Sequence, residues 1–336
     1  MTHSMMQDSA TQSAQLSFHD YHPQPDDFLR EVIHGLGRHP RRIGPKFFYD
    51  EHGSRLFDTI CRTPEYYPTR TEIGILERHV DDIARHIGKR CVLIEPGSGN
   101  SRKVRILLDR LKPRAYLPVD ISKNYLRSTA EHVAAEYPWL AVHAVCADYT
   151  APLTLPACPP DVQRLVFFPG STIGNFDPVP ATAFLRNMVE LAGPSGGLLI
   201  GVDLKKDPAV LHAAYNDAQG ITAAFNLNLL TRINRELDAD FDLARFQHRA
   251  FYSTGLGRIE MHLVSADAQQ VRVGERHFDF ARDESIHTEN SYKYSVDEFQ
   301  TLARRSGWAP VAVWTDPARL FSVHYLQAEP AVAGHH

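Results

Sequence analysis

Residues 92–103, with the sequence VLIEPGSGNSRK, constrain the fold more than any other part of the chain. Three apolar residues run into a Pro-Gly pair, which is typical of a buried parallel strand that ends at a turn. Gly97 and Gly99 allow a ligand to approach the main chain closely, and the polar residues up to Ser101 offer caps for a following helix. The segment therefore predicts a strand–loop–helix unit that holds a small cofactor, although such turns also serve packing alone.

A carboxylate at the end of the next expected strand supports the cofactor interpretation. Asp120 follows the apolar residues 115–119 and lies about 20 residues after Gly99, the spacing at which an acid reaches ribose hydroxyls. The loop lacks the third glycine of the full dinucleotide pattern, and Lys103 lies where a close helix–sheet contact would favour a small residue. The loop thus favours a phosphate-free nucleoside cofactor, such as S-adenosylmethionine, over a pyrophosphate.

Strand and helix patterns alternate through the middle of the chain, as in the βαβ units of a parallel sheet. The expected strands are 91–95, 115–119, 142–147, 164–168 and 197–202, and the expected helices are 102–111, 122–137 and 179–192. These ranges predict an α/β fold with its ligand site at the carboxyl ends of the strands.

The pattern changes after Asp203. The expected elements are a helical stretch through residue 246, strands at 258–265 and 270–278, a helix at 295–306, and strands at 309–314 and 320–326. We expect 258–265 and 270–278 to be antiparallel neighbours, and the last two strands to close the first sheet as an antiparallel pair. A second structural unit is therefore inserted between strands of one sheet, while the first 80 or so residues show no strand repeat.

Composition narrows the class of partner. The chain has 336 residues, of which 43% are hydrophobic and 23% charged, as in a globular protein of one or two domains. Its formal net charge of −4 offers no broad positive field for nucleic acid. No stretch reaches the roughly 18 apolar residues of a membrane span, and residues 1–15 have no apolar signal core. We expect a cytoplasmic protein that binds a small molecule, with neither a nucleic-acid nor a membrane partner.

Cysteine and histidine usage does not indicate a metal site. Cys91 and Cys146 fall inside expected strands, where a thiol packs as a small hydrophobe. The chain has 18 histidines, but it contains no HExxH motif and no His/Cys cluster at ligand spacing. The sequence therefore predicts no metal.

Polar and aromatic groups outside the glycine loop suggest a second ligand. Asn175 is the second-last residue of the segment FFPGSTIGNF, where an apolar strand runs into a loop of small residues. It either caps a turn or binds a carboxylate. Aromatic residues gather in 47–50 and 64–70, where they either pack between domains or form pocket walls.

The segment HTENSYKY carries a further candidate surface. Strand alternation puts Glu289, Ser291 and Lys293 on one face. That face is either a solvated edge strand or a surface on which Glu289 and Ser291 bind a ring with two nitrogens, such as imidazole.

Eight blocks in the same order resemble the histidine-specific N-alpha-methyltransferases of ergothioneine biosynthesis, over about residues 28–327. The blocks are IEPGSGNSRK, VDIS, PEYYPTR, FFPGSTIGNF, AYNDAQGITAAFNLNLL, NRELDADF, RIEM and TENSYKY. The resemblance implies a Rossmann-like class I methyltransferase sheet in residues 70–203 and 295–328. It also implies an α+β substrate domain in residues 18–69 and 204–294, and we expect a monomer.

The resemblance implies two groups of site residues. Those expected to hold S-adenosylmethionine are Gly97, Ser98, Lys103, Asp120, Asp148 and Tyr149, with Asp120 on the ribose and Asp148 near the adenine. Those expected to hold histidine are Tyr66 and Asn175 on its carboxylate, Tyr215 beside them, Glu289 and Ser291 on the imidazole, and Met261 against the ring. Tyr49 is expected to face the reacting amine and to orient the path of its proton.

The implied reaction is the S-adenosylmethionine-dependent trimethylation of the α-amino group of L-histidine to hercynine, the first step toward ergothioneine. One alternative is the same transfer to another amino acid or amine, such as tryptophan. Two alternatives from other classes are a nicotinamide-dependent oxidoreductase, which the missing third glycine disfavours, and a non-catalytic module that retains the cofactor cleft.

Overall fold

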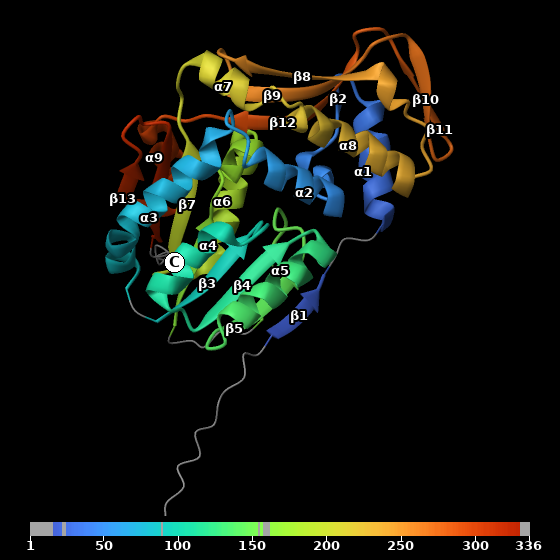
Figure 1. The fold of residues 1–336 in the computed structure, drawn as a ribbon. Helices are drawn as coiled ribbons and strands as arrows, with labels where there is room; N and C mark the ends of the chain where they lie inside the picture. Colours follow the sequence, from blue (N-terminus) through green and yellow to red (C-terminus); the bar gives the residue numbers. More distant parts are fainter. Residues whose placement is uncertain (1–15, 22–24, 89, 154, 157–161, 330–336) are drawn as a thin grey trace, which may run out of the picture.

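The computed structural model describes residues 16–21, 25–88, 90–153, 155–156 and 162–329. Its largest sheet has eight strands in the order β1-β5-β4-β3-β6-β7-β14-β13 (Figure 1). These strands are β1 (Leu16–Asp20), β3 (Cys91–Pro96), β4 (Ala115–Asp120), β5 (Ala141–Cys146), β6 (Gln163–Phe168), β7 (Gly197–Asp203), β13 (Trp308–Thr315) and β14 (Phe321–Ala328). All neighbours are parallel except that β14 runs antiparallel to both β7 and β13.

Helices cover both faces of this sheet, so its central strands are buried on both sides. Apolar residues of α3 (Tyr67–Ile87), α4 (Arg102–Leu111) and α5 (Lys123–Glu136) form one core with the sheet. Those of α6 (Pro178–Ala192) and α9 (Val296–Arg305) form another on the opposite face. The result is the doubly wound, Rossmann-like arrangement, closed by the expected antiparallel pair β13–β14.

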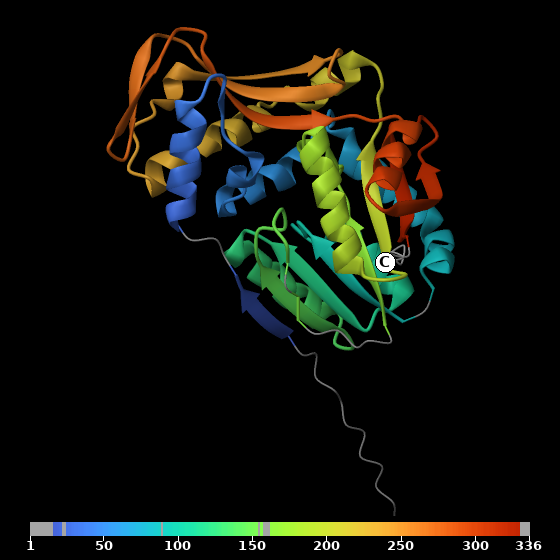
Figure 2. The same ribbon diagram turned by 180° about the vertical axis from the view of Figure 1, so that it is seen from behind.

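A second unit joins the amino-terminal part of the chain to residues 204–294, and it stands above the strand ends of the first sheet (Figures 1 and 2). Its sheet has the order β2-β12-β9-β8. Its elements are α1 (Pro25–Gly37), β2 (Arg41–Arg42), η1 (Pro45–Phe48), α2 (Glu51–Ile60), α7 (Pro208–Ala214), α8 (Ile221–Glu236), η3 (Leu243–Arg245), β8 (Phe246–Ser253), β9 (Arg258–Ser265), β10 (Gln269–Val273), β11 (Arg276–Phe280) and β12 (Ser285–Tyr292). These segments share a core of their own that runs from Phe28 to Ile286.

The expected strand at 270–278 is wrong, because that segment is a hairpin. The chain turns at Gly274, which has φ +56°, and β10 pairs with β11 rather than with β9. A two-residue turn between alternating residues reads like a continuous strand. The antiparallel neighbours of β9 are instead β8 and β12.

The amino-terminal region also contains a strand that the sequence pattern did not reveal. Residues Leu16–Asp20 form β1, which pairs in parallel with β5 at the edge of the main sheet. Its five residues are partly or fully exposed, so they lack the apolar run that marks the central strands. Among the described residues, no helix is long and apolar enough to cross a membrane.

Candidate active site

Two adjoining chambers lie between the strand ends of the main sheet and the second unit. The large chamber has a volume of about 400 Å³ and reaches the glycine loop. The small chamber, of about 50 Å³, lies beneath β9 and β12. The residues that line both are Tyr49, Phe57, Tyr66, Gly170, Thr172 and Asn175. A group bound in one chamber therefore faces a group bound in the other.

The expected site residues divide between the two chambers. The large chamber contains Gly97, Ser98, Lys103, Asp120, Asp148 and Tyr149. The small chamber contains Tyr215, Met261, Glu289 and Ser291. Tyr49, Tyr66 and Asn175 line both chambers, so they lie at the junction where a group bound in the large chamber would meet a group bound in the small one.

The glycine loop after β3 is tied to the end of β4. Gly97 donates its N–H to the Val119 carbonyl at 2.7 Å, and Gly99 donates to Asp120 Oδ2 at 3.1 Å. Ser122 donates to the other oxygen of the same carboxylate at 2.9 Å. Burial raises the pKa of Asp120 while these backbone donors oppose the shift. Asp120 is thus an oriented acceptor at a strand end, as ribose hydroxyls require.

The loop also fits a closely approaching ligand. Gly97 has φ +70°, and a side chain there would lie 3.3 Å from the Tyr149 ring. The Ser98 hydroxyl is buried and, among the described residues, has no hydrogen-bond partner. Buried polar groups normally find partners, so this hydroxyl is free to bond a cofactor. These features fit S-adenosylmethionine, which Gly97, Ser98, Asp120 and Tyr149 would hold.

Ion pairs hold two further walls of the large chamber. Lys103 Nζ lies 2.5 Å from the fully buried Glu72 carboxylate, which also accepts from the Gly170 N–H. Lys46 of η1 lies 3.0 Å from Asp148. Burial opposes ionisation of Asp148, but Thr150 and Lys46 hold its pKa below the usual value. The Lys46 contact joins the second unit to the main sheet over the chamber.

The small chamber presents one carboxylate to its contents. Glu289, Ser291 and Lys293 all line it, as strand alternation predicts. Burial raises the pKa of Glu289 to about 7, against the opposing charge of Lys293. Among the described residues, none forms a hydrogen bond or ion pair with the Glu289 carboxylate, and Lys293 acts on it only through its charge. Glu289 is therefore available to a ligand that donates a hydrogen bond.

A buried charge network, which the sequence did not reveal, supports this chamber. Lys293 Nζ donates to Ser291 Oγ at 2.8 Å and to the Tyr215 hydroxyl at 3.2 Å, and it lies 2.7 Å from Asp203. Lys206 and Tyr67 also contact Asp203, at 2.6 and 2.8 Å. Asp203 ends β7 in the first sheet, whereas Lys293 follows β12. Their pairing depends on how the two units meet, for which no local pattern gives a signal.

Aromatic rings surround the junction. Tyr49 makes edge contacts with Phe57 and Phe225 at centroid distances of 5.8 and 5.7 Å. Tyr66 packs edge-on against Tyr215 at 6.3 Å. Burial, followed by nearby acidic groups and hydroxyls, raises the pKa of Tyr49 and Tyr66 well above the usual value. Both hydroxyls are therefore neutral, and they can orient a proton or face a cation without ionising.

A doubly wound sheet with an antiparallel final pair, a glycine-bracketed loop and a strand-end carboxylate define a class I S-adenosylmethionine-dependent methyltransferase. The chain belongs to the family of histidine-specific, S-adenosylmethionine-dependent methyltransferases, whose profile matches residues 28–328. This membership excludes the nicotinamide-dependent oxidoreductase considered from the sequence.

Curated relatives cover most of the chain. It is 43% identical over 300 residues to a histidine N-alpha-methyltransferase of Mycolicibacterium smegmatis, covering 88% of this chain and 92% of that protein. It is 32% identical to ergothioneine biosynthesis protein 1 of Neurospora crassa, over 82% of this chain and 32% of that longer protein. It is 29% identical to a 4-dimethylallyltryptophan N-methyltransferase of Claviceps purpurea, over 90% and 95% of the two chains.

Proposed function

We propose that the protein trimethylates the α-amino group of L-histidine to hercynine, the first step toward ergothioneine. The observation that carries this proposal is the unpaired Glu289 carboxylate in a small chamber that opens onto the large chamber. An imidazole N–H is a donor of the right kind for this carboxylate, and Ser291 offers a hydroxyl from the same strand.

S-Adenosylmethionine supplies a methyl group already activated by its sulfonium. The residues of the junction then hold the acceptor. Tyr66 and Asn175 bind the histidine carboxylate, with Tyr215 beside them, and Met261 packs against the ring. Holding the amine in line for attack is worth roughly 7–11 kcal/mol when the geometry is good. No covalent nucleophile is needed.

Tyr49 orients the path by which the amine loses its proton before each transfer. Its neutral hydroxyl can hold a water that accepts this proton. As methyl groups accumulate, the amine becomes a quaternary ammonium, which the faces of Tyr49 and Tyr66 stabilise by roughly 0.5–2 kcal/mol. The same rings therefore serve all three methylations.

A second candidate function is methylation of another amino acid or amine, such as tryptophan. The Claviceps purpurea relative, named for a tryptophan derivative, gives this candidate its support. Glu289 disfavours acceptors whose side chain lacks a hydrogen-bond donor, and such sites discriminate by about 10⁴-fold. Because indole also has an N–H donor, histidine is favoured over tryptophan by Ser291, whose hydroxyl can bond the second imidazole nitrogen, which indole lacks.

The deciding experiment is mass spectrometry of single amino acids incubated with the full chain and S-adenosylmethionine. Gains of one, two and three methyl groups on histidine alone support the proposal. Methylation of tryptophan or another amine in place of histidine would show that the enzyme has a different substrate. No methylation of any amino acid despite cofactor binding would indicate a non-catalytic module.

The proposal also includes the organisation of the enzyme. Residues 70–203 and 295–328 form the cofactor domain together with β1, which pairs with β5 in the main sheet, so the expected start of the substrate domain at residue 18 is too early. Residues 25–69 and 204–294 form the substrate domain, and the enzyme acts as a cytoplasmic monomer. Separate cores beneath the two sheets support the division. Size-exclusion chromatography with light scattering measures the mass of the protein in solution and tests whether it is a monomer.

A further inference from the structure

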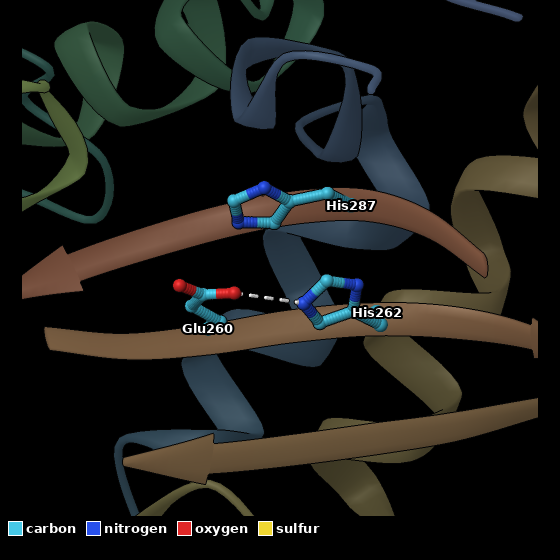
Figure 3. A group of neighbouring side chains, drawn as sticks. All are labelled: Glu260, His262 and His287. Carbon is cyan, nitrogen blue, oxygen red and sulfur yellow. Dashed lines mark hydrogen bonds and ion pairs between the residues drawn. The ribbon is translucent and has the colours of Figure 1, made fainter. Parts of the chain in front are cut away.

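Three potential metal ligands meet on the second sheet, on the face opposite the small chamber. Glu260 and His262 belong to β9, and His287 belongs to the neighbouring β12 (Figure 3). His262 and His287 are direct partners in the antiparallel register. Met261, between the two β9 ligands, points the other way and lines the small chamber.

The ligand atoms are close enough to share one ion. One nitrogen of each histidine and one Glu260 oxygen all lie within 4.8 Å of one another. His262 Nε2 and Glu260 Oε2 are 3.1 Å apart. Ligand atoms bound to one tetrahedral zinc at roughly 2.0–2.1 Å lie about 3.3 Å apart. This pair thus already has the separation that a shared metal requires.

Outer contacts hold the Glu260 and His262 side chains in place and leave one ligand atom of each for an ion. His287 Nε2, the ring nitrogen that faces Glu260 in Figure 3, lies 3.0 Å from the Glu289 main-chain oxygen, and an ion would bind this nitrogen in place of that contact. The other ring nitrogen of His262 lies 3.2 Å from Ser285 Oγ. Arg258 binds Glu260 Oε1 at 2.7 Å, which leaves Oε2. Metal-binding histidines almost always use their second nitrogen as His262 does.

The surroundings give an ion access from solvent. Arg249, Arg258 and Arg42 lie nearby, and Arg258 and Arg42 both pair with Asp177, at 3.1 and 2.8 Å. The Glu260 and His262 side chains keep 12% and 15% of their surface exposed, so an ion can enter from solvent. The imidazole rings stack with centroids 4.6 Å apart and planes 12° apart. They must tilt toward each other when an ion binds.

We propose that Glu260, His262 and His287 form a binding site for a divalent transition metal of the zinc class. Two imidazoles and one carboxylate are the ligands that such ions accept, with water completing the coordination. The site lies outside the methyl-transfer chambers. Because His287 and Glu289 lie two residues apart on β12, a bound ion would brace the strand that presents Glu289 to the substrate.

The test measures the binding of Zn²⁺ and Co²⁺ to the full chain at about pH 8, where imidazoles are neutral. His335 and His336 are first replaced by alanine, so that the chain terminus does not bind the ion. Isothermal titration calorimetry with Zn²⁺ gives the stoichiometry, and the visible spectrum of added Co²⁺ reports nitrogen ligation. One equivalent bound, with a Co²⁺ spectrum of low coordination number, is the expected result.

Variants locate the ion. The double variant His262→Gln/His287→Gln should bind Zn²⁺ at least about tenfold more weakly, as should Glu260→Gln. The matched control, His132→Gln/His212→Gln, replaces two exposed histidines on helices and should bind as the parent does. Circular dichroism shows whether each variant folds, and Glu260→Gln keeps the test available if the double variant does not. The proposal would be overturned if the parent did not bind Zn²⁺ stoichiometrically. It would also be overturned if folded variants of Glu260, His262 and His287 bound Zn²⁺ as tightly as the parent.

Discussion

The Lys293 ammonium lies 2.7 Å from the Asp203 carboxylate, and both side chains are almost fully buried. This pair joins the end of β7 in the main sheet to the segment after β12 in the second unit. Burial disfavours the charge of Lys293, yet Asp203 and Tyr215 hold its pKa above the usual value. The floor of the small chamber is therefore anchored by an ion pair that spans both units.

Lys293→Met should destabilise the fold and weaken histidine binding. Removing one partner of a buried ion pair leaves an uncompensated charge and typically costs about 3–5 kcal/mol; the remaining contact of Asp203 with Lys206 puts this variant at the lower end. The control is Lys205→Met, because Lys205 pairs with Glu298 on the surface and should cost less than about 1 kcal/mol. Urea unfolding measures both. Equal losses would contradict the role of the buried pair.

Glu289→Gln should stabilise the protein, but only at higher pH. The Glu289 pKa is about 7 in the folded chain against an ordinary value of 4.5. A raised carboxyl pKa means that its stability contribution is fully present below about pH 4.5 and is lost as the pH rises through 7. The variant should exceed the parent by up to about 3 kcal/mol at pH 8 and match it near pH 4.5. If urea unfolding showed the same difference in stability between variant and parent at every pH, the pKa of Glu289 would not be raised by folding.

Glu289→Ala should impair the use of histidine far more than the binding of cofactor. The carboxylate faces the small chamber, whereas the cofactor loop borders the large one. Loss of a charged hydrogen bond of about 1.5–3 kcal/mol predicts that histidine binds at least about tenfold more weakly. Calorimetric titrations with histidine and with S-adenosylmethionine measure the two affinities separately. An equal loss of both would show that Glu289 does not bind the imidazole.

Asp120→Asn should weaken the binding of S-adenosylmethionine by about tenfold or more, because an amide replaces a charged acceptor with one oxygen. Its backbone donors, Gly99 and Ser122, remain in place. Asp81→Asn is the control, since Asp81 lies 73% exposed on α3. Calorimetric titration with the cofactor measures both variants. Unchanged affinity in Asp120→Asn would mean that another residue binds the ribose.

Much of the main sheet could be predicted because its signals are local. The buried strand β3 is a run of apolar residues, and the glycines after it mark the turn by their positive φ angles. The edge strand β1 and the β10–β11 hairpin were harder to predict from the sequence. β1 is too short and exposed to carry an apolar run, and Gly274 turns the chain within what reads as one strand.

Local periodicity by itself determined that Glu289, Ser291 and Lys293 share one face, since side chains alternate along a strand. The glycine loop and Asp120 were likewise determined by strand ends and spacing. Only the tertiary structure decided that Lys293 meets Asp203, that the two chambers adjoin at Tyr49, and that His262 faces His287. The physical reason is that these contacts depend on strand register and on the packing of one unit against the other, which join residues far apart in the chain.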